Sequence, residues 1–250
     1  MPAGILRGYR DVPGSIPGVG TIFNDAQICP SSVVAYHAAL SRLRLGFEFR
    51  LGRFCVFTMN LTAIVAKDNS KEFQDFLSLY RIAFPPEEQI PDELFWYSIH
   101  MEGAKVTTYY AEEILGKKFY AGFSFVIETE QFLFLYFLAV NPEIRSKGIG
   151  SEIIQNHLMK QYPGKTIVLN VESPDELAED NHSRLRRIAF YERLGFVQMN
   201  CSFTDGCVMF SVLSTSSELD LNAYVEFLRK LCGCDELPDE IDIHMPSSQL

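Results

Sequence analysis

The stretch that most constrains the fold is QFLFLYFLAVNPEIRSKGIG, residues 131–150. It begins as an unbroken apolar run rich in aromatic residues, which is typical of a strand buried on both faces of a sheet. The Asn141-Pro142 pair that follows is a stop signal, because proline cannot donate a ladder hydrogen bond. The pattern therefore predicts a buried strand that ends near Val140.

A helix is predicted directly after this strand. Five residues recur at helical spacing and share one face of it: Ile149, Ile153, Ile154, His157 and Leu158. The preceding turn is then a helix N-terminus, where backbone N–H groups lack partners and the helix dipole is positive. Such a turn suits phosphate oxygens, and Gly148 and Gly150 let a ligand approach the backbone. Taken alone, two glycines here also fit a simple turn.

The rest of the chain from Met59 onward predicts a mixed α/β domain. Further strands are expected at residues 61–66, 105–110, 118–127, 166–171, 196–202 and 207–213. Further helices are expected at residues 71–84, 92–100, 183–194 and 219–231. We assign residues 59–214 to the domain and residues 215–250 to a last helix and a mobile tail.

Residues 1–58 differ from the rest, because they contain arginine but no lysine and open with a Gly/Pro-rich segment without periodicity. Three interpretations compete: a transit peptide, a small extra subdomain, and an over-extended reading of a gene whose natural start is Met59. We favour the third, with a poorly ordered extension as the next choice.

Composition narrows the classes of partner. The formal net charge of −10 disfavours nucleic acid and anionic membranes and favours a cationic ligand. No apolar stretch is long enough to span a membrane. The cysteines form no CxxC pair, so we expect reduced thiols in a cytoplasmic protein. The histidines show no metal-ligand spacing, so we expect no metal. We expect a monomer or a homodimer.

Three features stand in a fixed order along the chain. They are the strand, turn and helix with Arg145, Gly148 and Gly150, the short strand to Val171, and the helix ending in FYERLGF at residues 190–196. Together they resemble the GNAT superfamily of acyl-CoA N-acyltransferases. The family's cofactor motif R/Q-x-x-G-x-G/A matches the turn, and its F-Y-E-x-L-G-F segment is matched in full. The resemblance spans about residues 61–213.

The resemblance implies the GNAT fold, an α/β (mixed α+β) architecture whose central, mostly antiparallel sheet is splayed at the cofactor site and flanked by helices. Acetyl-CoA would be the co-substrate. Its pyrophosphate would lie on the backbone of Arg145, Ser146, Lys147, Gly148, Ile149, Gly150 and Ser151. Its pantetheine arm would pair like a strand with Leu138, Ala139 and Val140, and catalysis would be chiefly proximity.

The resemblance also suggests which residues transfer protons in the reaction. The phenol of Tyr191 would protonate or hydrogen-bond the departing CoA thiolate, or else pack its ring under the sheet. Glu172, directly after a short strand, is a candidate base for the amine, with an exposed loop acid as the alternative. Tyr136 and Trp96 are candidates to line the amine site, and Tyr136 could orient a water.

The sequence departs from the family pattern at one place. Many members carry an asparagine seven residues before the matching tyrosine, where this chain has Arg184, while Asn181 lies three residues earlier. Either residue is a candidate for contacting the cofactor. The cluster of Arg184, Arg186 and Arg187 would contact CoA phosphates or, as we favour, balance the acidic residues Glu176, Glu179 and Asp180.

The sequence therefore predicts an N-acetyltransferase that moves an acetyl group from acetyl-CoA to a primary amine by direct attack. No cysteine falls in the matched motifs, which argues against a thiol nucleophile. A small amine is favoured, while a protein N-terminus or lysine stays open. The alternative is a catalytically silent acyl-CoA-binding sensor or scaffold module.

Overall fold

The computed structural model describes residues 60–84, 89–112, 118–205, 208–233 and 241–244. The predictions for residues 1–58, for a start at Met59 and for the turns at Gly116 and Gly206 fall outside these ranges. None of the helices within them combines the length and apolar character needed to cross a membrane.

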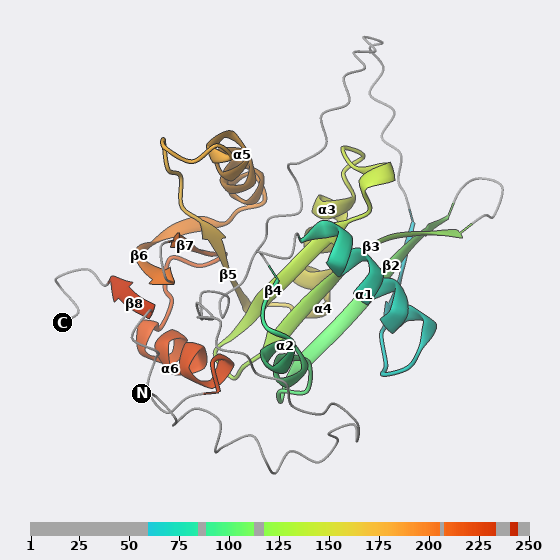
Figure 1. Cartoon of the computed structure of the whole chain (residues 1–250), viewed down its shortest axis with the longest axis horizontal. Coiled ribbons are helices and arrows are strands. Elements are labelled where there is room, and N and C mark those ends of the chain that lie inside the picture. The colour runs from blue at the N-terminus through green and yellow to red at the C-terminus, as the bar shows by residue number, and fades with distance from the viewer. Residues whose placement is uncertain (1–59, 85–88, 113–117, 206–207, 234–240, 245–250) are drawn as a thin grey trace, which may run out of the picture.

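The described strands form one eight-stranded sheet in the order β1-β2-β3-β4-β5-β7-β6-β8 (Figure 1). Its strands are β1 (Leu61–Val65), β2 (Ala104–Glu112), β3 (Lys118–Glu128), β4 (Phe132–Val140), β5 (Thr166–Glu172), β6 (Val197–Asp205), β7 (Val208–Ser214) and β8 (Ile241–His244). The β4–β5 pair is parallel, and every other pair of adjacent strands in the described sheet is antiparallel. The predicted mostly antiparallel sheet is confirmed.

Helices cover both faces of this sheet. On one face, α1 (Lys71–Ala83), α2 (Asp92–Ile99) and α6 (Leu221–Leu231) bury aromatic side chains against it, in what we call the aromatic core. On the other face lie α5 (Asn181–Glu192) and a continuous helical segment made of α3 (Ile149–Glu152), the π-helical stretch Ile153–Leu158 and α4 (Met159–Gln161). These helices enclose a second, largely aliphatic core, so the fold has three layers.

The local signals of the sequence explain where the elements begin and end. Ser70 caps α1 by accepting a hydrogen bond from the backbone of Phe73, at 3.1 Å. The amide of Asn141 ends β4 by donating to the Tyr120 carbonyl, at 2.9 Å. Gly195, with φ of +91°, follows α5 in the left-handed conformation that helix ends favour. These observations agree with the predicted boundaries.

Strand β4 is buried along its whole length and carries a bulge at Tyr136. Phe125 of β3 pairs with Phe137 and Val126 pairs with Leu135, so Tyr136 has no partner of its own on β3. The extra residue reverses the alternation of side chains, and both Tyr136 and Phe137 lie in the aromatic core. A bulge also bends a strand and increases its twist, which matters at the end of β4.

The C-terminal tail differs from the prediction. Instead of being mobile throughout, residues 241–244 form β8, which pairs antiparallel with β6. The side chains of Thr204 and His244 lie 2.9 Å apart across this pair. Four residues that include an acidic one give too little periodicity to identify an edge strand from sequence.

The aromatic core makes a stability prediction. Phe76 of α1 is fully buried, with its ring centroid 4.7 Å from that of Phe123 and 5.9 Å from that of Phe95. Phe76→Ala is expected to lower the free energy of unfolding by about 3–5 kcal/mol, because it leaves a cavity among rings that cannot collapse. Chemical denaturation measures this loss.

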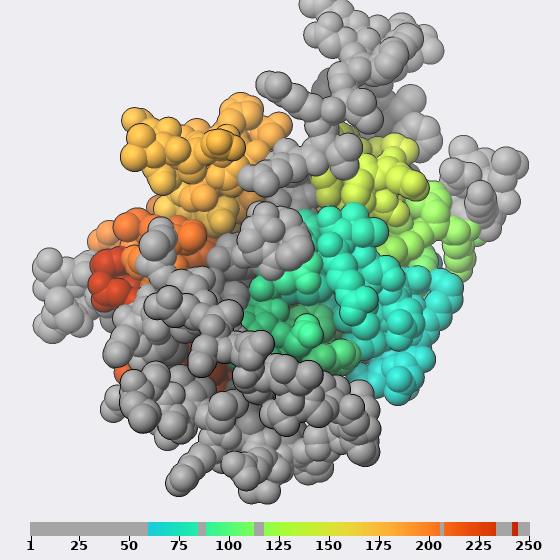
Figure 2. All heavy atoms as spheres, viewed as in Figure 1, coloured from blue at the N-terminus to red at the C-terminus, as the bar shows by residue number. Residues whose placement is uncertain are grey.

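The same helix offers the control. Helix α1 lies at the surface in the space-filling view (Figure 2), and its residue Ile82 is 70% exposed. Ile82→Ala should change the free energy of unfolding by less than about 0.5 kcal/mol. Equal losses in the two variants would contradict the assignment of Phe76 to the core.

Candidate active site

Strands β4 and β5 separate after their first three residue pairs. Phe132, Leu133 and Phe134 pair with residues 166–168, and no further pair joins the two strands. Beyond this point β4 stays paired with β3, while β5 stays paired with β7. Among the described residues, the backbone edge of residues 135–140 that faces β5 therefore has no strand partner and suits an extended ligand, and the predicted splay is confirmed.

The open edge includes the three residues predicted to hold the pantetheine arm. Leu138, Ala139 and Val140 pair with β3 on their other side, which fixes the direction of the open edge. The Val140 carbonyl accepts a hydrogen bond from Nε of Arg145, at 3.3 Å. Because Asn141 donates to Ala121 of β3, the alternation along the strand turns Ala139 toward β3 and leaves the backbone groups of Leu138 and the Val140 N–H facing the open edge.

The turn after β4 exposes the backbone at the start of α3. Ser146 and Gly148 both have a left-handed backbone, with φ of +65° and +81°. No side chain caps α3, and its first backbone hydrogen bond runs from Glu152 to the Gly148 carbonyl, at 2.9 Å. The N–H groups of residues 149–151 thus have no acceptor among the described residues and carry the positive end of the helix dipole.

The two glycines of the turn serve different purposes. A Cβ on Gly148 would meet no atom within 4 Å, so glycine is favoured there by the backbone conformation. A Cβ on Gly150 would lie 3.2 Å from the ring of Phe190, so glycine is favoured there by the close approach of α5. The turn is thereby held against the helix that carries Tyr191.

The cationic side chains of the turn also differ. Arg145 is half-buried against the end of β4, and burial lowers the pKa of its guanidinium. Ser146 and Lys147 are exposed. Lys147 is therefore the side chain of the turn that is available to a solvent-borne polyphosphate, while Arg145 supports the turn.

Tyr191 lies in the second core beside the open edge. It is 2% exposed, packs between the rings of Phe190 and Phe196, and belongs to the same apolar cluster as Leu138 and Val140. Burial raises the pKa of its phenol, and the nearby Arg187 cation lowers it in part. The phenol therefore keeps its proton at neutral pH and can donate it.

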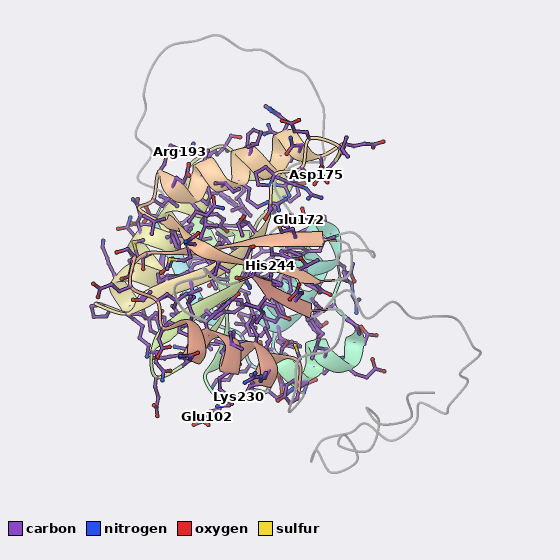
Figure 3. The ribbon with its side chains drawn as sticks, turned by 90° about the vertical axis from the view of Figure 1, so that its left-hand side faces the viewer. Glu102, Glu172, Asp175, Arg193, Lys230 and His244 are labelled. Carbon is purple, nitrogen blue, oxygen red and sulfur yellow. The ribbon has the colours of Figure 1, made fainter. Side chains whose placement is uncertain are left out.

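Glu172 is not the exposed loop acid that the sequence allowed. It is 6% exposed and lies beneath α5 at the end of its strand (Figure 3). Its Oε2 atom is 3.4 Å from Nη1 of Arg187 and 3.5 Å from Nε of Arg184. Two cations already hold this carboxylate, so its contacts favour the role of a buried counter-ion over that of a base.

Arg184 and Asn181, the two residues at which the sequence departs from the family pattern, both form hydrogen bonds with the loop before α5. Arg184 donates to Asp180 at 2.9 Å and to the Ser173 carbonyl at 3.2 Å. The Asn181 side chain accepts from the backbone of Asp175 at 2.9 Å. Arg184 thus balances Asp180, as favoured, and Arg184 and Arg187 both pair with Glu172, which was not expected. Within the described ranges, no ion pair joins them to Glu176 or Glu179.

Trp96 and Tyr136, the two candidates to line the amine site, lie in different surroundings. Trp96 on α2 is 43% exposed, with its ring 6.0 Å from that of Phe73. Tyr136 is fully buried among aromatic rings, 4.5 Å from that of Phe137. Tyr136 therefore lies in the aromatic core, on the same face of β4 as Phe132 and Phe134.

The sequence predicted Arg187 only as one member of a basic cluster, with no role of its own. It is 2% exposed, and its Nε atom has no hydrogen-bond acceptor in the described part of the chain. Its position one helical turn before Tyr191 is the one signal that could have found it. Nothing in the local pattern separates it from its exposed neighbour Arg186, because burial of this face depends on the strand beneath.

Comparison with protein families identifies residues 104–198 as a match to the family described as "Acetyltransferase (GNAT) domain". The matched range contains β4, the turn, β5 and α5. It therefore covers both parts of the candidate cofactor site and Tyr191. A search of curated proteins found no match to the chain.

Three solved structures are similar to this chain. A protein from Bacteroides thetaiotaomicron described as a member of the GNAT family is 22% identical, over 69% of this chain and 96% of that one, with a TM-score of 0.52. The ribosomal-protein-S18-alanine N-acetyltransferase of Escherichia coli is 18% identical, over 64% and 96% of the two chains, with a TM-score of 0.45. The Bacillus subtilis acetyltransferase in complex with CoA is 16% identical, over 62% and 97%, with a TM-score of 0.44. The first likeness shows the fold.

The ion pair beneath α5 makes a second prediction. Glu172→Gln leaves the Arg187 cation buried without a compensating charge, which is expected to lower the free energy of unfolding by about 3 kcal/mol. Glu172→Gln combined with Arg187→Met removes both charges and should recover most of that loss. Urea denaturation of the single and double variants measures the coupling.

Glu176, which is exposed in the same loop, supplies the control. Glu176→Gln should stay within about 0.5 kcal/mol of the unmodified protein. A Glu172→Gln variant as stable as this control would show that the buried pair contributes nothing to folding.

Proposed function

Because the chain belongs to the GNAT superfamily of acyl-CoA N-acyltransferases, we propose that it transfers an acetyl group from acetyl-CoA to the primary amine of a small molecule. One observation carries the proposal: the open edge of β4 leads directly into a turn whose backbone N–H groups have no acceptor among the described residues. A strand edge suits the amide-containing pantetheine arm and the turn suits its pyrophosphate.

The two parts of the site would hold acetyl-CoA at both ends of the pantetheine arm. The N–H groups of residues 149–151, with the exposed Lys147, would bind the pyrophosphate. On the Leu138–Val140 edge, the outward-facing backbone groups of Leu138 and the Val140 N–H would pair with the arm, as an added strand pairs with a sheet edge. The thioester would then lie in the opening between β4 and β5, close to Tyr191. Catalysis would follow mainly from holding amine and thioester together.

The transfer is a direct attack. The neutral amine nitrogen forms a bond to the thioester carbonyl carbon, and the C–S bond then breaks with its electron pair moving to sulfur. The nitrogen loses one proton and the sulfur gains one. Tyr191 would donate the proton to sulfur, since its buried phenol stays protonated, and would regain one from water.

The proton leaving the amine needs an acceptor other than Glu172. That carboxylate is held by Arg184 and Arg187, and taking a proton would weaken both contacts. We propose that ordered water carries this proton to bulk solvent. This replaces the expectation that Glu172 is the general base.

A hollow between α1 and the strands β1, β2 and β3 supports an acceptor of small-molecule size. It has a volume of about 320 Å³, and residues of β1, α1, β2 and β3 line it: Ile64, Lys71, Glu72, Asp75, Tyr110, Lys118 and Tyr120. Asp75 is engaged by Lys71 at 2.7 Å and by the Tyr110 hydroxyl at 2.5 Å. Glu72 and the tyrosine rings are the groups that suit a cationic amine.

We also place the enzyme in the cytoplasm as part of this proposal. Cys201 is a free, buried thiol, and burial raises its pKa to about 11. Buried neutral thiols persist where the surroundings are reducing.

Tyr191→Phe tests the proton donor. Removal of the hydroxyl should lower kcat about 100-fold while leaving the Kd for acetyl-CoA nearly unchanged, because the ring keeps its packing. Release of free thiol measured over a panel of amines gives kcat, and calorimetry gives Kd. Tyr162, another buried tyrosine of the second core, is the control, and Tyr162→Phe should keep kcat within about twofold. Full activity of Tyr191→Phe across pH would remove Tyr191 from the mechanism.

Gly148→Asp tests the phosphate site. The new carboxylate would face the pyrophosphate and should weaken acetyl-CoA binding about 100-fold. Gly148→Asn has nearly the same size and tolerates the same backbone without the charge, so it should bind far better than the aspartate variant. Calorimetric titration with acetyl-CoA compares the two.

Two outcomes would count against the proposal. Unchanged affinity in Gly148→Asp would remove the turn from the cofactor site. Tight acetyl-CoA binding with no thiol release over a broad panel of amines would indicate a silent acyl-CoA-binding module in place of an enzyme.

A further inference from the structure

Arg187 is a buried cation that has no role in the proposed reaction as described. Its side chain leaves α5 four residues before Tyr191, so both side chains point from the same face of the helix. It is 2% exposed and Tyr191 is equally buried. Burying a guanidinium is costly unless its donors and its charge are satisfied.

The hydrogen-bond donors of the Arg187 guanidinium are only partly satisfied. Its Nη1 atom donates to Glu172 at 3.4 Å, which is longer than the roughly 2.7–2.9 Å of a strong charge-assisted hydrogen bond. Its buried Nε–H has no acceptor in the described ranges of the chain. Most buried polar groups in proteins are hydrogen-bonded, so a free donor on a buried cation indicates a place for an anionic or acceptor atom.

The surrounding charges do not supply that atom. Arg184 lies 2.9 Å from Asp180 and 3.5 Å from the carboxylate that holds Arg187, so Glu172 is shared between two cations. Tyr191 is the titratable group that faces Arg187 on α5, and the cation lowers the pKa of its phenol against the effect of burial. The positive charge of Arg187 is therefore felt at the hydroxyl of Tyr191.

We propose that the positive charge of Arg187 stabilises the CoA thiolate beside Tyr191. Glu172 holds the guanidinium in place. When the C–S bond breaks, the electron pair moves to sulfur and Tyr191 donates its proton. Arg187 exchanges no proton, and its fixed charge favours the negative charge that develops there. The inference rests on the proposed function, because it needs the CoA sulfur to lie near Tyr191.

The inference predicts a lowered pKa for the thiol of bound CoA. A thiol ordinarily has a pKa near ~8.5, and a site that binds the thiolate better binds CoA more tightly as pH rises. Desulfo-CoA, which lacks the sulfur atom, is the matched ligand, because it keeps the pyrophosphate and the pantetheine amides. For a pKa lowered by one unit, the affinity of CoA relative to desulfo-CoA should rise about eightfold between about pH 6 and pH 9.

The unmodified protein and three variants distinguish this role of Arg187 from a purely structural one. The unmodified protein should show the rise with pH, and Arg187→Lys, which keeps a charge, should show part of it. Arg187→Met combined with Glu172→Gln removes both charges, which avoids an unpaired buried carboxylate, and its relative affinity should not change with pH. Arg193→Met, at an exposed position of the α5 C-terminus, should behave like the unmodified protein.

Calorimetric titrations with both ligands at each pH decide the matter. A pH-independent ratio in the unmodified protein, or an unchanged rise in the double variant, would overturn the role of Arg187. Desulfo-CoA binding would persist in either case, so the proposed function would be untouched. Failure of the unmodified protein to bind either ligand would overturn the proposed function and this inference with it.

Discussion

Strands β4 and β5 pair over three residues and then part, although both continue beyond that point. Each strand keeps its other neighbour, so the sheet divides into one half ending in β4 and another beginning with β5. The bulge at Tyr136 lies where the parting begins and supplies the added bend and twist. The candidate cofactor site depends on this division, because a strand edge can bind an extended ligand only where no neighbouring strand occupies it.

The same division explains why charged residues are found deep in the molecule. Glu172 ends β5 next to the opening, and α5 packs over it with Arg184 and Arg187. A buried pair of this kind contributes little to stability compared with apolar packing, so its presence calls for another reason. Stabilising a negative charge during the reaction is such a reason, and it fits a guanidinium whose Nε has no acceptor in the described chain.

Much of the fold could be predicted from local patterns. The nine buried residues of β4, the cap at Ser70 and the turn at Gly148 follow from short-range chemistry, and the structure agrees with each. The predictions that differ depend on distant neighbours. Residues 241–244, expected in a mobile tail, form a strand because β6 offers them an edge.

By itself, the sequence determined the order of strand, turn and helix, the left-handed glycine of the turn and the tyrosine that follows β5, because each depends on neighbours in the chain. Tertiary structure alone decided which of these groups meet. It opened the edge of β4, buried Glu172 between two arginines and brought the charge of Arg187 to Tyr191. The physical reason is that burial and charge pairing depend on separation in space, which the spacing of residues along a chain does not record.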